Sequence, residues 1–120
     1  MLNLDEGKKA VLFARKVVEQ FVKDNKTKDL DLGKSFLEKQ GAFVTLHTFP
    51  DNNLRGCIGI PLPVMPLRNA IAEGAKSATR DPRFPPLEEN ELDDIIIEVT
   101  ILSKPEIIKI PEGFYGIYEI

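Results

Sequence analysis

Apolar residues recur at helical spacing near the start of the chain. From Ala10 to Val22 they return every three or four positions, and charged residues fall mostly between them. Asn3 and Glu6 have the spacing of a capping box, in which each side chain binds the backbone N–H of the other residue. The pattern predicts an amphipathic helix that begins there, ends near Lys23 and packs its apolar face on the core.

A second helix is predicted from Leu67 to about Thr79. Pro66 suits the first turn of a helix, where a missing backbone N–H costs no hydrogen bond. Small side chains fill this segment and would let the helix lie close to a sheet: Ala70, Ala72, Gly74, Ala75, Ser77 and Ala78. Between the two helices, SFLEKQ (residues 35–40) predicts one helical turn.

Strand-like runs accompany these helices. GAFVTLHTF (residues 41–49) and LRGCIGI (residues 54–60) predict a β-hairpin, because the Pro-Asp-Asn of residues 50–52 favours a turn. IIIEVTIL (residues 95–102) predicts another strand, and its continuous apolar start indicates a central, buried position. The polar LEENELDD before it predicts a turn or short helix, and EIIKI and FYGIYEI after it predict two weaker strands.

This order of elements predicts an α+β fold with a mainly antiparallel sheet and helices packed on one face. A chain of 120 residues is long enough to bury its own core, so we expect a single domain over residues 1–120. Hydrophobic residues make up 42% and charged residues 29% of the chain, which is typical of globular proteins.

Charge and composition argue against several classes of function. The net charge of −3 disfavours general nucleic-acid binding, which depends on a basic surface. The apolar runs are too short to span a bilayer, so no membrane association is expected. One histidine and one cysteine cannot complete a structural zinc site, and no metal is predicted. The acidic start MLNLDEGKK lacks the pattern of a signal peptide, and a lone cysteine forms no disulfide within the chain, so we expect a cytoplasmic location.

The register of the hairpin decides which side chains accompany Cys57, the only cysteine. A three-residue loop places Phe49 opposite Asn53. Along the hairpin, even-numbered residues of one arm then pair with even-numbered residues of the other, and odd-numbered with odd-numbered. Because side chains alternate along a strand, the apolar residues of both arms then share the core face: Val44, Leu46, Leu54, Ile58 and Ile60. The opposite face then carries Thr45 across from Cys57, His47 across from Arg55, and Gly59.

This face is the candidate functional site. A thiol near a guanidinium and an imidazole gains thiolate character, so Cys57 is a candidate nucleophile and His47 a candidate general base. The nearby Gly56 and Gly59 leave backbone N–H groups open to a ligand. The alternative is structural, because cysteine often packs as a small apolar side chain and a strand histidine is more often hydrogen-bonded than catalytic.

Arg83 is a further candidate for the same site. Prolines surround it in DPRFPP (residues 81–86) and stiffen the loop after the second helix. If that helix packs beside the hairpin, Arg83 could approach Arg55 and form an anion-binding rim. The alternative is that Arg83 pairs with Asp81 or with the acidic residues 91–94, while Phe84 fills the core.

Three stretches resemble, in order, the AMMECR domain family: GAFVTLHTFPDNNLRGCIG, PLRNAIAEGAKSATRDPRFPP and ELDDIIIEVTIL. LRGCIG is the hallmark motif of that family, and GAFVTLH and DPRFPP are also characteristic of it. The resemblance extends from the first helix to about Pro105. It implies one AMMECR-like α+β domain over residues 1–120, without the C-terminal part usual in the family.

The resemblance also implies a ligand-binding cleft at the hallmark motif, near Cys57 and His47. The residues that it assigns to binding are Leu54, Arg55, Gly56, Ile58, Gly59 and Arg83. It implies no settled reaction, and the cofactor is unknown. Relatives are associated with a Memo-like protein and a radical S-adenosylmethionine enzyme, which suggests a shared modification pathway.

Two functions stay open on these grounds, besides a third, purely structural role as a scaffold that assembles the modification machinery. The first is a protein that binds a small-molecule or peptide ligand, as an enzyme or its accessory, with Cys57 as a functional thiol. The second is a non-catalytic regulatory module that binds nucleic acid or a protein, and nucleic acid is not favoured because the chain is acidic. The residues that would supply its contacts are Arg55, Lys76, Arg80 and Arg83.

Overall fold

The computed structural model of the chain describes residues 3–24, 32–103, 106–109 and 115–118. Within them, the helices and strands are α1 (Leu4–Asp24), β1 (Ala42–Thr48), β2 (Leu54–Ile60), α2 (Leu67–Ala78), β3 (Ile95–Ile101), β4 (Glu106–Lys109) and β5 (Tyr115–Tyr118). Short 3₁₀ helices, Lys34–Leu37 and Glu89–Asp94, precede β1 and β3. This order confirms the predicted α+β fold.

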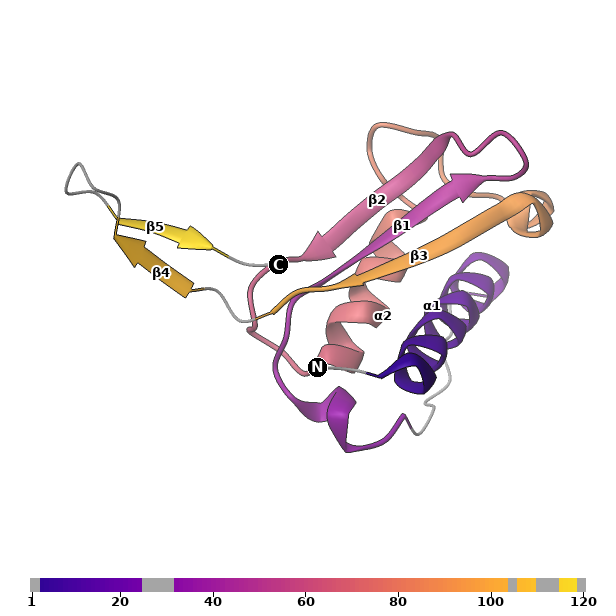
Figure 1. The fold of residues 1–120 in the computed structure, drawn as a ribbon. Coiled ribbons are helices and arrows are strands. Elements are labelled where there is room, and N and C mark those ends of the chain that lie inside the picture. Colours follow the sequence, from indigo (N-terminus) through magenta and orange to yellow (C-terminus); the bar gives the residue numbers. More distant parts are fainter. Residues whose placement is uncertain (1–2, 25–31, 104–105, 110–114, 119–120) are drawn as a thin grey trace.

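β1 is the central strand of an antiparallel sheet with the order β2–β1–β3 (Figure 1). The prediction that residues 95–102 form a central strand is therefore wrong for the described residues, in which β3 lies at an edge. Ile95 and Ile97 are buried, whereas Ile96 between them is 43% exposed on the other face. The run of three isoleucines belongs to a strand that is buried on one side only. β4 and β5 form a separate antiparallel pair, as the two weaker strand-like runs predicted.

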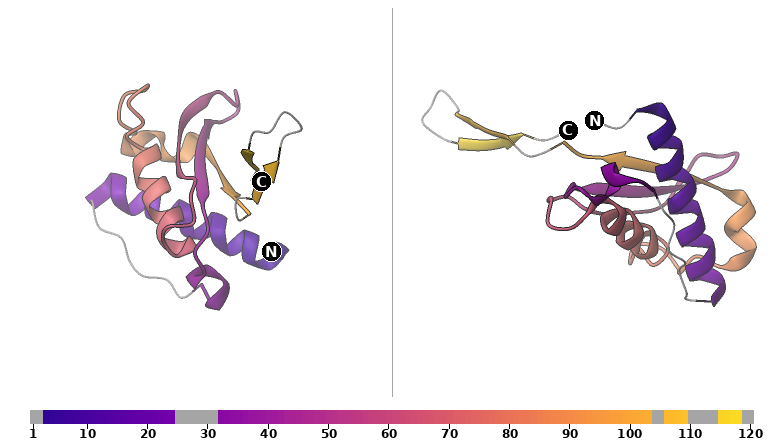
Figure 2. Two further views of the ribbon diagram at one scale, coloured as in Figure 1. Left: turned by 90° about the vertical axis from the view of Figure 1, so that its left-hand side faces the viewer. Right: turned by 90° about the horizontal axis from the view of Figure 1, so that it is seen from below.

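Both long helices lie toward the same face of the three-stranded sheet (Figure 1). α2 packs on β1 and β2, and α1 packs on α2 and β3 (Figure 2). No helix in the described part of the chain covers the other face, which we call the open face. Its side chains are Phe43, Thr45 and His47 of β1, Leu54, Cys57 and Gly59 of β2, and Ile96, Glu98 and Thr100 of β3. None of the described helices is long and apolar enough to cross a membrane.

The ends and packing of the helices follow the sequence closely. The predicted capping box is present at α1: the Glu6 N–H donates to Asn3 Oδ1 at 2.9 Å, and the Asn3 N–H donates to Glu6 Oε1 at 3.2 Å. The small residues of α2 bring it close to the sheet, because a Cβ at Gly74 would lie 3.3 Å from Val44 Cγ2. The core lies between the helices and the sheet, with Phe13, Val17, Val18, Phe36, Val44, Leu46, Leu67 and Ile71 among its buried side chains.

Gly56 lies close against the C-terminal end of α2. A Cβ at Gly56 would lie 2.2 Å from the carbonyl oxygen of Ala78, a backbone atom that can move only if the helix end moves. We expect Gly56→Ala to lower the free energy of unfolding, measured by urea denaturation, by about 2–3 kcal/mol. Gly7→Ala is the matched control: nothing lies within 4 Å of a Cβ there, and alanine in a helix should stabilise by about 0.5–1 kcal/mol. Equal stability of Gly56→Ala and the unmodified protein would contradict this packing.

Candidate functional site

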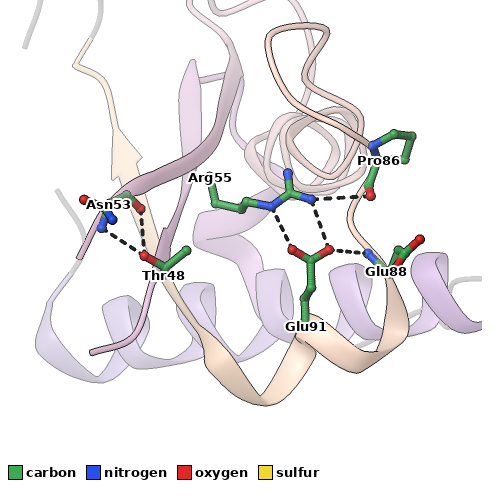
Figure 3. Close-up of polar contacts among 6 residues, drawn as sticks. All are labelled: Thr48, Asn53, Arg55, Pro86, Glu88 and Glu91. Carbon is green, nitrogen blue, oxygen red and sulfur yellow. Dashed lines mark hydrogen bonds and ion pairs between the residues drawn. The ribbon is translucent and has the colours of Figure 1, made fainter. Parts of the chain in front are cut away.

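The hairpin loop consists of residues 49–52. The Thr48 N–H donates to the Asn53 carbonyl at 2.8 Å, and the Asn52 N–H donates to the Thr48 carbonyl at 2.8 Å. The Asn53 N–H also donates to Thr48 Oγ1 at 3.0 Å (Figure 3). Asn52 has the left-handed conformation expected of it, with φ 57°. The predicted three-residue loop is wrong, because Thr48 rather than Phe49 lies opposite Asn53.

A β-bulge in β2 compensates for the longer loop. Thr45 lies opposite Cys57, as predicted, but His47 lies opposite Leu54 and not opposite Arg55. Between these two pairs β2 has one residue more than β1, which is the definition of a bulge. Because of the extra residue, the side chains of β2 that precede the bulge point to the face opposite to the one predicted for them. Leu54 therefore joins His47 on the open face, where it is 40% exposed, rather than the core face where it was predicted.

Arg55 is held by partners within the protein (Figure 3). Its Nε donates to Glu91 Oε1 and its Nη2 to Glu91 Oε2, both at 3.0 Å, and Nη2 also lies 3.4 Å from the Pro86 carbonyl. The Arg55 side chain is only 11% exposed. The fork from Arg55, helped by the Glu88 N–H, holds the pKa of Glu91 below its usual value. Arg55 thus joins β2 to the 3₁₀ helix before β3.

Asp81 and Arg83 bind the backbone of Cys57 from outside the sheet. β2 is an edge strand, and the Cys57 N–H points away from β1 to Asp81 Oδ2 at 3.0 Å. Arg83 Nη2 donates to the same carboxylate oxygen at 2.7 Å and lies 3.4 Å from the Cys57 carbonyl. The Asp81 side chain is 1% exposed and that of Arg83 is 57% exposed. We call this pair the edge clamp, because it occupies the place of a neighbouring strand.

The loop that carries the edge clamp shows which of the two predicted roles Arg83 has. The Arg83 N–H donates to Asp81 Oδ1 at 3.0 Å, which is the geometry of an Asx turn, and Pro82 lies at its corner. The structure shows the pairing of Arg83 with Asp81, which is the alternative that the sequence left open, and Arg55 pairs with Glu91. Each guanidinium thus has a carboxylate partner, and the anion-binding rim of Arg83 and Arg55 stays a prediction. Phe84 is half-buried beside the Arg83 guanidinium, 5.6 Å from ring centroid to Cζ.

Cys57 is half-buried, and its side chain lies on the open face. Its Sγ lies 3.1 Å from Thr45 Oγ1, and either atom can be the donor. Thr45 and Cys57 form a pair whose backbone groups point away from each other, and such pairs bring their side chains closest together. Arg83 contacts the carbonyl of Cys57 and not its thiol.

His47 and Glu98 complete the polar part of the open face. His47 lies diagonally from Cys57, two residues beyond Thr45 along β1. Its Nε2 lies 3.5 Å from Glu98 Oε2, and its Nδ1 is buried without a hydrogen-bond partner among the described residues. Glu98 was not among the predicted site residues, and no local pattern marks it, because only the register of β3 places it beside β1.

The remaining residues of the LRGCIG segment divide between the two faces of the sheet. Gly56 packs on α2, and Ile58 faces the helices. Gly59 lies under the ring of Phe43, whose Cδ1 would be 2.5 Å from a Cβ at that position. The described residues contain no group of three side chains arranged to hold a metal ion.

Comparisons with known proteins agree with this fold. The family profile described as AMMECR1 matches residues 11–118. Protein MJ0810 of Methanocaldococcus jannaschii is 51% identical over 111 residues, which cover 92% of this chain and 55% of that protein. A protein of Methanocella arvoryzae is 49% identical over 112 residues, covering 91% and 56% respectively.

A solved structure has the same fold. The crystal structure of the uncharacterized protein PH0010 from Pyrococcus horikoshii superposes with a TM-score of 0.85 at 37% sequence identity. The match covers 92% of this chain and 57% of that one. The chain thus spans a little over half the length of the relatives that it matches.

The edge clamp predicts a specific acid sensitivity. The hydrogen bonds from Arg83 and from the Cys57 N–H hold the pKa of the Asp81 carboxyl well below its usual range. In the unfolded chain the Asp81 carboxyl has its ordinary pKa, at about pH 4. Asp81 therefore contributes its full stabilisation of the fold above that pH, and this stabilisation is lost as the pH falls toward the lower pKa of the folded state. We expect Asp81→Asn to be less stable than the unmodified protein at pH 7, and the difference to narrow below about pH 4. Urea denaturation of both proteins across this range measures it, and a difference independent of pH would contradict it.

Proposed function

This chain belongs to the AMMECR1 family, and from that premise we propose that it binds a small or peptidic ligand on the open face, with the Cys57 thiol as the reacting group. One observation carries the proposal. Cys57 is half-buried rather than fully buried, its side chain lies on a face that no described helix covers, and the Thr45 hydroxyl lies 3.1 Å from its sulfur.

The surroundings of the thiol suit a reactive site. The edge clamp holds the backbone of Cys57 from outside the sheet, and Thr45 holds its side chain from the neighbouring strand. A nucleophile that is held on both sides loses little conformational freedom when it meets a ligand. Leu54 and Ile96, on either side of His47, add apolar surface that an organic ligand can contact.

His47 is the proposed general base. The thiol sulfur forms a bond to an electrophilic carbon of the ligand, and the thiol proton passes to the imidazole. The electron pair of the bond between that carbon and its carbonyl oxygen or leaving group moves to the oxygen or the leaving group. Glu98, 3.5 Å from His47 Nε2, stabilises the resulting imidazolium. The ligand-binding contacts proposed at Leu54 and Gly59 lie on the same face as this pair.

The basic residues give less support to a nucleic-acid-binding module. Arg55 and Arg83 are each paired with a carboxylate, and Lys76 Nζ lies 3.8 Å from Glu73 Oε1. Phosphate binding at Arg55 or Arg83 would therefore have to break an ion pair first. Arg80 is the remaining member of the set, and its guanidinium stacks on Phe21.

Alkylation of Cys57 tests the proposal, because the chain has no other cysteine. We expect iodoacetamide to alkylate the folded protein at neutral pH at least as fast as it alkylates glutathione. His47→Gln should slow the reaction about tenfold, since the base is lost while the fold remains. Mass spectrometry of the intact protein measures the rate. Alkylation that occurs only as fast as the protein unfolds would show that Cys57 is a packing residue and overturn the proposal.

Arg55→Lys is the matched control for this experiment. Lysine keeps the charge but cannot make both hydrogen bonds to Glu91, so we expect a loss of about 1–2 kcal/mol in the free energy of unfolding. The alkylation rate should stay unchanged, because Arg55 does not touch the thiol. Single-stranded RNA that binds both the unmodified protein and Cys57→Ala, with an affinity falling steeply as salt is added, would instead favour the regulatory module.

A further inference from the structure

A groove lies on the side of β2 opposite the thiol of Cys57. Ile58 follows Cys57 in the strand, and because side chains alternate, it points to the helix side of the sheet. The groove has a volume of about 380 Å³ and is lined by Phe21, Ile58, Glu73, Lys76, Ser77, Arg80 and Pro82. This volume falls within the range of small-molecule sites in proteins. β2 itself separates the groove from the open face.

The polar wall of the groove is positively charged. Lys76 lies in the last turn of α2 and Arg80 just beyond its end, and Glu73 is the only acidic residue among the described residues of the lining. Lys76 contacts Glu73 only loosely, at 3.8 Å. The Arg80 guanidinium lies 4.7 Å from the centroid of the Phe21 ring and has no carboxylate partner among the described residues. The ring fixes one face of the guanidinium and leaves its N–H groups for a ligand.

Capping of the last carbonyl groups of α2 does not account for these two cations. Basic residues at a helix end can bind the last carbonyl groups, which have no partner within the helix. Here those carbonyls have partners already: Thr79 Oγ1 donates to the Lys76 carbonyl at 2.6 Å and the Leu87 N–H donates to that of Thr79 at 2.8 Å. The side chains of Lys76 and Arg80 line the groove instead.

We propose that this groove binds a small organic anion. Its carboxylate or phosphate group would pair with Lys76 and Arg80, and the exposed hydroxyl of Ser77 would add a hydrogen bond. Its flat, apolar body would lie against Phe21, Ile58 and Pro82. The site is independent of the thiol, because its side chains lie on the other side of β2.

Titration of the ¹⁵N-labelled protein with three probes of similar size tests the charge requirement. Benzoate and phenyl phosphate carry the proposed anionic groups, and benzamide has the same ring without the charge. We expect both anions to shift the amide signals of Ile58, Ser77 and Arg80 saturably, and benzamide to bind about tenfold more weakly. The tighter of the two anions identifies whether the site prefers a carboxylate or a phosphate. Equal binding of benzoate and benzamide, or no saturable shift at these amides, would overturn the proposal.

Charge-removing variants locate the site. Arg80→Gln and Lys76→Gln should each weaken binding of the preferred anion about fivefold to tenfold, while dispersed amide signals show that the variants remain folded. Lys16→Gln removes an exposed charge of α1 outside the groove and should leave binding unchanged. If Lys16→Gln weakened anion binding as much as the two groove variants, the binding would reflect the overall charge of the protein, and this would contradict a specific site in the groove. Cys57→Ala should bind as the unmodified protein does, so this result and the alkylation result are independent.

Discussion

The buried carboxylate of Asp81 is the contact on which the position of Cys57 depends. β2 lies at the edge of the sheet, so no strand of the described residues accepts the outward N–H of Cys57, and Asp81 accepts it instead. A buried carboxylate is stable only when its charge is balanced, and Arg83 supplies that balance from the solvent side. The edge clamp therefore holds the main chain at Cys57 without covering the side chain. This is why the thiol can be firmly placed and still lie on the open face.

The LRGCIG segment contributes to both faces of the sheet, because side chains alternate along a strand. Arg55 and Gly56 hold the strand in place, one through its fork to Glu91 and the other through its close approach to α2. Cys57 then faces the open side, and Ile58 faces the groove between the helix ends. The structure thus separates residues that support the strand from residues that a ligand could meet. Mutations at Arg55 or Gly56 therefore report on stability, whereas mutations at Cys57 test the proposed function.

The sequence predicted the elements better than their long-range partners. The helical period and the capping box of Asn3 gave α1 closely, since both signals are local. The pairing of Thr45 with Cys57 was predicted correctly from an incorrect loop. The two agree because the bulge near Arg55 offsets the extra residue of the loop. The central position of β3 was wrong, since an apolar run does not say whether one or both faces are covered. The turn Asp-Pro-Arg could have indicated the edge clamp, whereas Glu91 and Glu98 meet their partners only through tertiary structure.

Native-state hydrogen exchange of two amides in β2 tests the edge clamp most directly. Cys57 and Gly59 both point their N–H groups to the outer edge of the sheet, because residues two apart in a strand point the same way. Asp81 accepts the first, and no described residue accepts the second. We predict that the Cys57 amide exchanges only through large-scale unfolding, while the Gly59 amide exchanges much faster. Equally fast exchange at both positions would show that Asp81 does not hold Cys57, and would contradict the account of how the thiol is placed.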